Sequence, residues 1–344
     1  MLSQTPILTA AVLAAAAFST AAHGTEVFRT GLMELRVADD ARPLDGFLWY
    51  PTEAEDGLVR AHGNAVWEAI RVIPHAAPAE GLRPLVVLSH GMYGNARNQA
   101  WLAAELSQAG YIVAAIDHPG TSTFLRDPDD AREMWERPRD ITRTIDHILA
   151  DAAVGPQVDP DRIYMAGHSL GGLTAVMLAG ARYDPARIDA FCADGADDLV
   201  CGILSMWDVA QSEADRVTIA QDCSDPRLAG IAVFDLGGTQ AFAPESFATI
   251  ETPMLVIGAP IANSGLNLDL ESRALVEMLP EGTPYLEPET LAHFDFLGVC
   301  TAQGLDILRE EEPDDTMVCE DGTDARRAEH AMIAQAVISF FEAH

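Results

Sequence analysis

Residues 167–171 read Gly-His-Ser-Leu-Gly, and they constrain the fold more than any other feature of the chain. They join an apolar run at 162–166, typical of a buried strand, to a segment at 170–179 that has the character of a helix. The two glycines are expected because side chains at their positions would collide with the neighbouring strand and helix. Such a turn lifts the hydroxyl of Ser169 clear of the sheet, at a helix N-terminus that favours an anion. We therefore predict that Ser169 is a nucleophile.

The rest of the chain alternates between strand-like and helix-like segments. Further apolar runs typical of buried strands occur at 85–88, 111–116, 230–234 and 254–257. Helical spacing occurs at 98–109, 138–149 and 324–341. This rhythm predicts an α/β protein with a doubly wound, mostly parallel sheet. Two strands are also expected between 27 and 51, whereas 52–81 is interpreted as a loop or insertion.

A serine hydroxyl needs a base, and in this kind of strand–turn–helix site the order along the chain is Ser, Asp or Glu, then His. Three histidines follow Ser169. His344 is the terminal residue, and His330 lies in the last amphipathic helix, where we expect a surface role. His293 follows a predicted strand at 284–286, in a loop rich in phenylalanine. We predict that His293 is the base.

The acid that orients the base should lie between Ser169 and His293. Asp235 ends the apolar run at 231–234 and precedes two glycines, so its carboxylate is expected at the sheet edge where ligands bind. Asp269 is the alternative, although eleven residues separate it from the strand at 254–257. We favour Asp235.

Acyl transfer also needs donors for the oxyanion of the tetrahedral intermediate. The backbone N–H of Leu170 is one candidate, because it directly follows the nucleophile. The loop 89–94, Ser-His-Gly-Met-Tyr-Gly, follows an earlier strand and offers the N–H of Met92 as the second donor. His118 could line the pocket, orient the Met92 loop or serve a structural role.

Several of these motifs together resemble serine hydrolases of the α/β-hydrolase superfamily, in particular dienelactone-hydrolase-like proteins. They are His-Gly at 90–91, Asp-His-Pro-Gly at 117–120, Arg-Pro-Arg-Asp at 137–140 and Gly-His-Ser-Leu-Gly-Gly at 167–172. Trp-Tyr-Pro at 49–51, the segment 230–235 and the loop around His293 are similar to platelet-activating-factor acetylhydrolases. In acetylhydrolases the acid follows the strand after the nucleophile helix, which favours Asp235. Dienelactone hydrolase proper has a cysteine where this chain has Ser169, so a dienelactone substrate does not follow.

We predict an α/β-hydrolase domain over residues 25–344, of which the resemblance covers roughly 30–300. The segment 182–227 interrupts the alternation of strands and helices and matches neither family, and it is either a cap over the active site or a surface excursion. The expected activity is hydrolysis of a small-molecule carboxylic ester through an acyl-enzyme, without cofactor or metal. Two rival classes remain open: a non-catalytic exported binding protein of the same fold, and an amidase or thioesterase with the same triad.

Charge and composition limit the classes of molecule that this protein can bind and the reactions that it can catalyse. The chain has 53 Asp and Glu against 21 basic residues, for a formal net charge of −32, and it contains no lysine. Such a surface repels nucleic acid and anionic lipid, and Schiff-base chemistry on a lysine is excluded. An apolar run at 7–18 and small residues at 19–22 predict a signal peptide over 1–22, with export to the periplasm or beyond. The alternative is an apolar first helix of the fold, and no later run is long enough to span a membrane.

The chain has five cysteines, and none lies in a C-x-x-C pair, which argues against zinc. Export would permit disulfides. Cys300 and Cys319 bracket an acidic segment interpreted as a loop, and Cys192 and Cys201 bracket a short acidic turn. We predict these two pairs, leaving Cys223 unpaired, although Cys201 with Cys223 is nearly as plausible from spacing.

Overall fold

The computed structural model describes residues 28–194, 198–320 and 322–344. The predicted signal peptide at 1–22 lies outside the described residues. One mixed sheet organises the described chain, with the strand order β10-β9-β8-β7-β5-β6-β2-β1-β4-β3. Its parallel part consists of β5 (Arg83–Ser89), β6 (Ile112–Ile116), β7 (Val158–His168), β8 (Leu228–Phe234), β9 (Met254–Ile257) and β10 (Tyr285–Leu286). The prediction of a mostly parallel sheet is confirmed.

The other strands form the N-terminal edge of the sheet. They are β1 (Arg29–Val37), β2 (Leu44–Thr52), β3 (Val59–Ala61) and β4 (Ile70–Pro74). β2 runs antiparallel to both β6 and β1, whereas β4 runs parallel to β1. The two strands expected between 27 and 51 are confirmed. The interpretation of 52–81 as a loop was wrong in part, because Val72 and Ile73 of β4 are buried. Strands of three and five residues are too short to show the alternation that identifies them.

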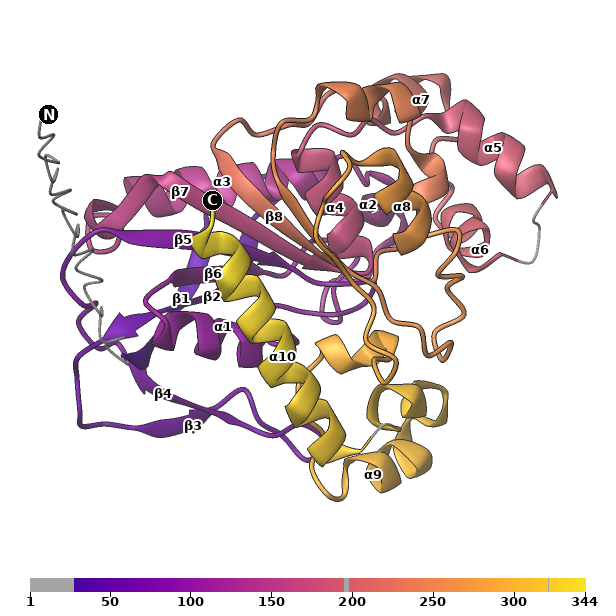
Figure 1. The fold of residues 1–344 in the computed structure, drawn as a ribbon. Helices are drawn as coiled ribbons and strands as arrows, with labels where there is room; N and C mark the ends of the chain where they lie inside the picture. Colours follow the sequence, from indigo (N-terminus) through magenta and orange to yellow (C-terminus); the bar gives the residue numbers. More distant parts are fainter. Residues whose placement is uncertain (1–27, 195–197, 321) are drawn as a thin grey trace, which may run out of the picture.

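Helices cover both faces of the sheet (Figure 1). α1 (Ala100–Gln108) and α10 (Thr323–Glu342) pack on one face, in a core that includes Trp101, Val113 and Phe341. α3 (Glu136–Ala150) and α4 (Leu170–Leu178) pack on the other face, where the core includes Ile145 and Val176. Two further helices are α2 (Pro128–Arg132) and α8 (Ser272–Met278). The second of the predicted helices begins at Glu136, two residues earlier than expected.

Two segments project from this sheet, each with a disulfide. The segment 182–227 contains α5 (Pro185–Asp194), α6 (Leu199–Met206) and α7 (Glu213–Ile219), which lie together at the upper right of Figure 1. Cys192 of α5 is bonded to Cys201 of α6. Near the lower end of α10, α9 (Gly304–Glu311) and the 3-10 helix η5 (Pro313–Cys319) lie between Cys300 and Cys319, which are also bonded. The structure confirms both predicted disulfides and leaves Cys223 as a thiol. The segment between Cys300 and Cys319 is helical, so its interpretation as a loop was wrong.

In the part of the chain that the structure describes, no helix is both long and apolar enough to cross a membrane.

Candidate active site

Ser169 lies on a strained turn between β7 and α4. Its φ of 54° and ψ of −119° are unusual for a residue with a side chain. The flanking glycines are required by close approaches: a Cβ on Gly167 would lie 2.0 Å from the carbonyl oxygen of Gly171, and a Cβ on Gly171 would lie 2.0 Å from that of Ser89. The sequence thus folds locally into the turn that presents the Ser169 side chain at the C-terminal edge of the sheet.

His293 and Asp235 form a buried pair. The Nδ1 of His293 lies 2.6 Å from Oδ2 of Asp235, and both side chains are almost fully buried. Because a carboxylate only accepts, Nδ1 carries the proton and Nε2 keeps a lone pair that can accept a proton. Asp235 directly follows β8, and its Oδ1 accepts a hydrogen bond of 3.0 Å from the backbone N–H of Ala259. Asp269, the alternative acid, is exposed and forms an ion pair with Arg273.

Ser169 and His293 line the same cavity, whose volume is about 1070 Å³. Within the described residues the Ser169 hydroxyl makes no hydrogen bond. Contacts between a nucleophile and its base commonly tighten only when substrate binds. The structure therefore brings the predicted nucleophile and the predicted base to one cavity, with the acid behind the base.

The two predicted oxyanion donors also line this cavity, and neither N–H has an acceptor among the described residues. The carbonyl oxygen of Gly91 accepts hydrogen bonds from the N–H of Gly94 at 3.1 Å and from Nδ1 of His90 at 2.7 Å. Because the C=O and N–H of a trans peptide point in opposite directions, the N–H of Met92 points away from these two donors. The Ser169 carbonyl likewise accepts from Gly172 at 2.8 Å, so the Leu170 N–H points out of the helix N-terminus.

His168, which sequence analysis left without a role, supports the predicted base. Its Nε2 donates a 2.8 Å hydrogen bond to the backbone carbonyl of His293, and the two ring centroids are 4.5 Å apart. Complete burial holds the pKa of His168 well below its usual range, so the ring is neutral. Its place inside the motif, on a buried strand beside Ser169, is the sequence signal that could have identified it.

The surface role predicted for His330 was wrong. Its side chain is buried and stacks on Trp101, with ring centroids 3.6 Å apart. Nε2 lies 2.8 Å from the carbonyl oxygen of Asp295 and 2.9 Å from that of Leu297. Burial lowers the pKa of His330 to about 3, so it acts as a neutral donor to the loop that carries His293.

Asp295 and Arg326 also stabilise the loop that carries His293. One carboxylate oxygen of Asp295 accepts from the N–H of Ala292 at 2.8 Å, and the other accepts from Nε of Arg326 at 3.0 Å. Arg326 also donates to the carbonyl oxygens of Gly298 and Val318. The segment closed by the disulfide between Cys300 and Cys319 is therefore linked to the His293 loop through one guanidinium.

The wall of the cavity is largely apolar. One group of apolar lining residues comes from α6 and its C-terminal neighbour: Leu199, Val200, Ile203, Leu204 and Trp207. Another group comes from other parts of the chain: Trp67, Phe294, Leu308 and Val318. The predicted cap segment thus contributes directly to the cavity that contains Ser169. Among the described residues no group of three or more His, Cys, Asp or Glu side chains could hold a metal ion.

The order of the sheet, the serine turn after β7 and the helices on both faces define the α/β-hydrolase fold. Residues 81–193 match a family model described as serine aminopeptidase, S33. A solved structure of ferulic acid esterase from Streptomyces cinnamoneus has a TM-score of 0.61 to this chain, at 22% identity, covering 94% of this chain and 92% of that one. This likeness shows the shared fold.

The chain is also similar to curated relatives over its central part. Cutinase est2 of Thermobifida alba is 35% identical over 101 residues, which are 29% of this chain and 31% of the relative. Bis(hydroxyethyl) terephthalate hydrolase of Streptomyces coelicolor is 27% identical over 137 residues, which are 40% of this chain and 34% of the relative. The chain thus matches about a third of the length of these relatives. The narrower resemblance to dienelactone-hydrolase-like proteins and acetylhydrolases remains a prediction.

Proposed function

We propose that this chain is a serine hydrolase that cleaves carboxylic esters, with Ser169 as nucleophile, His293 as general base and Asp235 as the acid that orients it. The observation that carries the proposal is the buried contact of 2.6 Å between His293 and Asp235 beside a strained serine in one cavity. A purely structural serine turn has no need for a histidine that lines the same cavity and is held from behind by a buried carboxylate.

The mechanism follows from this geometry. The Oγ of Ser169 attacks the ester carbonyl while Nε2 of His293 takes its proton, and the resulting oxyanion accepts hydrogen bonds from the N–H groups of Met92 and Leu170. His293 then protonates the leaving alcohol as the C–O bond breaks, which gives an acyl-enzyme. Water attacks this ester with His293 again as base, and the acid product leaves as Ser169 regains its proton. Asp235 holds the His293 tautomer throughout and stabilises the imidazolium.

Several observations favour an ester with an apolar group. The cavity wall formed by α6 is aliphatic, and Trp207, the residue after α6, also lines the cavity, so this wall suits an acyl chain or an aromatic ring. The strongly negative net charge disfavours anionic substrates. The relatives and the solved structure carry the names cutinase, bis(hydroxyethyl) terephthalate hydrolase and ferulic acid esterase, each of which denotes an ester hydrolase.

We also propose that 182–227 acts as a cap and that the protein is exported. Leu199, Val200 and Trp207 of this segment line the cavity, as a cap over bound substrate should. Two disulfides fit an oxidising compartment such as the periplasm or the extracellular space, since a reducing cytosol keeps thiols unpaired.

The test is a panel of nitrophenyl esters of rising acyl length, assayed with wild type and with Ser169→Ala. We expect Ser169→Ala to lose several orders of magnitude in kcat. Ser264→Ala is the matched control, because Ser264 lines the same cavity. Loss in both variants, or in neither, would remove Ser169 from the mechanism.

A fluorophosphonate probe separates the rival classes. Labelling that Ser169→Ala abolishes contradicts a non-catalytic binding protein of this fold, whereas an unlabelled wild type favours it. Matched anilide and thioester substrates then rank amidase and thioesterase activity against ester hydrolysis, and a better anilide or thioester than ester would reassign the reaction.

A further inference from the structure

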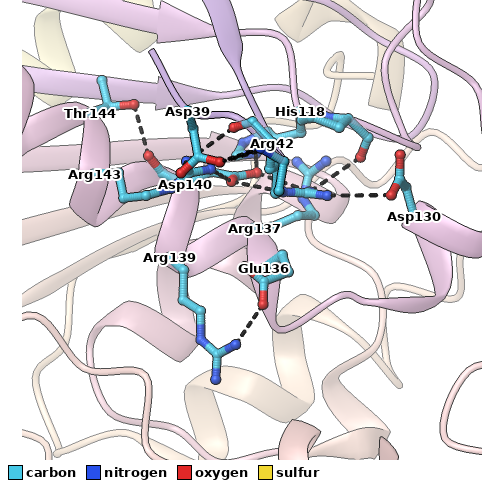
Figure 2. Close-up of polar contacts among 12 residues, drawn as sticks. Asp39, Arg42, His118, Asp130, Glu136, Arg137, Arg139, Asp140, Arg143 and Thr144 are labelled. Carbon is cyan, nitrogen blue, oxygen red and sulfur yellow. Dashed lines mark hydrogen bonds and ion pairs between the residues drawn. The ribbon is translucent and has the colours of Figure 1, made fainter. Parts of the chain in front are cut away.

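Arg137 is completely buried at the start of α3, and Figure 2 shows it close to Arg42 and His118. Its guanidinium reaches three separate elements. Nη2 donates to the carbonyl oxygen of His90 at 2.5 Å and to Oγ of Ser89 at 3.1 Å. Nη1 donates to Oγ1 of Thr121, and Nε donates to Oγ1 of Thr174 at 3.0 Å. One side chain thus joins the end of β5, the loop after β6 and the helix that follows the nucleophile.

These contacts lead to the first oxyanion donor. The His90 carbonyl lies two residues before Met92, and the His90 ring in turn donates to the carbonyl of Gly91, which shares its peptide group with the Met92 N–H. On the far side of Met92, the N–H of Tyr93 donates to the carbonyl of Thr121 at 2.8 Å. Arg137 therefore fixes the chain on both sides of the Met92 peptide.

A second route leads to the other donor. Thr174 accepts from Nε of Arg137 and donates its own hydroxyl proton to the carbonyl oxygen of Leu170 at 2.9 Å. Leu170 is the first residue of α4, and its N–H is the other predicted oxyanion donor. The relative position of the Met92 and Leu170 peptides is thus set through one rigid, planar guanidinium.

The burial of the charged Arg137 side chain has a cost in folding free energy. Among the described residues none of its acceptors is a carboxylate, and its hydrogen bonds reach a negative charge only indirectly, through Ser89, then His118, then Asp140. Burial lowers the pKa of Arg137 to about 9, which leaves it charged at neutral pH. A buried cation without a direct carboxylate partner is expensive, and an apolar side chain would fill the same space at lower cost.

His118 and Asp140 complete the support. His118 bridges Oγ of Ser89 and Oδ2 of Asp140 at 3.0 Å each, and its backbone N–H donates to Nε2 of His90 at 3.1 Å. Arg42 and Arg143 bind Asp140 from the other side (Figure 2). Of the three roles open to His118, the structure thus places it beneath the Met92 loop, outside the residues that line the cavity.

We propose that Arg137 is a positioning residue for the oxyanion hole: it sets the Met92 and Leu170 N–H groups at the separation that the tetrahedral oxyanion requires. The proposal rests on the esterase function proposed above. It concerns transition-state stabilisation and leaves ground-state binding of the ester untouched.

The experiment compares Arg137→Met and Thr174→Val with wild type. A displacement of about 1 Å can cost about 10²-fold in rate, so we expect Arg137→Met to lose about 10²-fold in kcat and Thr174→Val about tenfold, with KM within about threefold. The inhibition constant of a boronic acid, which forms a tetrahedral adduct with Ser169, should rise by the same factor as kcat/KM falls. Inhibition by the product acid should not change.

The chain offers matched controls on α3. Thr144 is as buried as Thr174 and donates in the same way, to the carbonyl of Asp140 at 2.8 Å, but no hydrogen bond joins it to Arg137. Arg139 follows two residues after Arg137 and is partly exposed. We expect Thr144→Val and Arg139→Met to keep kcat within about twofold. Should Arg137→Met fail to fold, the comparison of Thr174→Val with Thr144→Val decides.

The outcomes separate this proposal from the proposed function. An active Ser169→Ala would overturn both. An inactive Ser169→Ala together with a wild-type kcat in Arg137→Met, equal effects of the two threonine variants, or a boronic acid constant that does not follow kcat/KM would overturn the role of Arg137 alone.

Discussion

Replacing Asp235 with asparagine tests whether the Asp235 carboxylate orients His293 in the proposed triad. The carboxylate accepts two hydrogen bonds, one with each oxygen. Oδ2 accepts from Nδ1 of His293 at 2.6 Å, and Oδ1 accepts from the N–H of Ala259 at 3.0 Å. An asparagine has one acceptor oxygen and one amino group. The Ala259 N–H can only donate, so it selects the oxygen of the amide and turns the amino group toward His293.

This orientation reverses the tautomer of the base. An amino group facing Nδ1 requires Nδ1 to accept, which moves the ring proton to Nε2. The nitrogen nearest Ser169 then cannot take the hydroxyl proton. Holding the wrong tautomer costs about 10⁴-fold in kcat, or about 5.5 kcal/mol in the activation free energy. The side chain keeps its size and its hydrogen bond from the Ala259 N–H, so the fold should survive.

The assay is steady-state hydrolysis of nitrophenyl acetate, with thermal unfolding to verify the fold. Asp269→Asn is the matched control, because Asp269 is an exposed carboxylate paired with Arg273. We expect that control to keep its activity within about twofold. A loss smaller than about tenfold in Asp235→Asn, or an equal loss in Asp269→Asn, would refute the assignment of Asp235 as the orienting acid.

Three further predictions follow from the surroundings of the site. Removing the second disulfide with Cys300→Ala and Cys319→Ala should lower the free energy of unfolding by about 3 kcal/mol, measured by urea titration. His330→Ala should cost about 1–3 kcal/mol and lower kcat, because the carbonyls that hold the His293 loop lose their donor. Burial raises the pKa of Glu271 from 4.5 to about 8, so the stability that it contributes is full below pH 4.5 and lost as the pH rises through about 8; Glu271→Gln should flatten that slope in thermal scans.

The residues of the proposed triad could be named from the sequence because Ser169 and Asp235 are tied to local patterns. Ser169 has its two glycines and a strand before it, and Asp235 ends an apolar strand and precedes a glycine turn. His293 follows from the order of the triad along the chain. Parallel strands that end at one edge of the sheet bring such residues together. Patterns along the sequence are therefore sufficient to name these residues.

The supporting residues depend on packing that no local pattern encodes. His330 has helical spacing typical of a surface position, yet α10 packs on α1, and that packing buries the ring against Trp101. Arg137 was visible as part of a helix start, but an arginine in the first turn of a helix is normally exposed. Only the approach of β5, the loop after β6 and α4 makes its position an interior one. The short strands β3, at the edge of the sheet, and β4, beside it, were missed for the related reason that pairing, rather than periodicity, creates them.

The positions of the two disulfides have a consequence for how the protein matures. Each closes a short stretch of chain, with sequence separations of 9 and 19, and both lie outside the sheet, in the segments that wall the cavity. Short stretches close readily once the flanking helices form, and no bond crosses between strands. Synthesis in a reducing compartment should therefore still yield the sheet with its serine turn, but the two segments that wall the cavity should be less constrained. Such a protein would react with a small acetyl ester while discriminating poorly among bulky ones, and oxidation after export would restore selectivity.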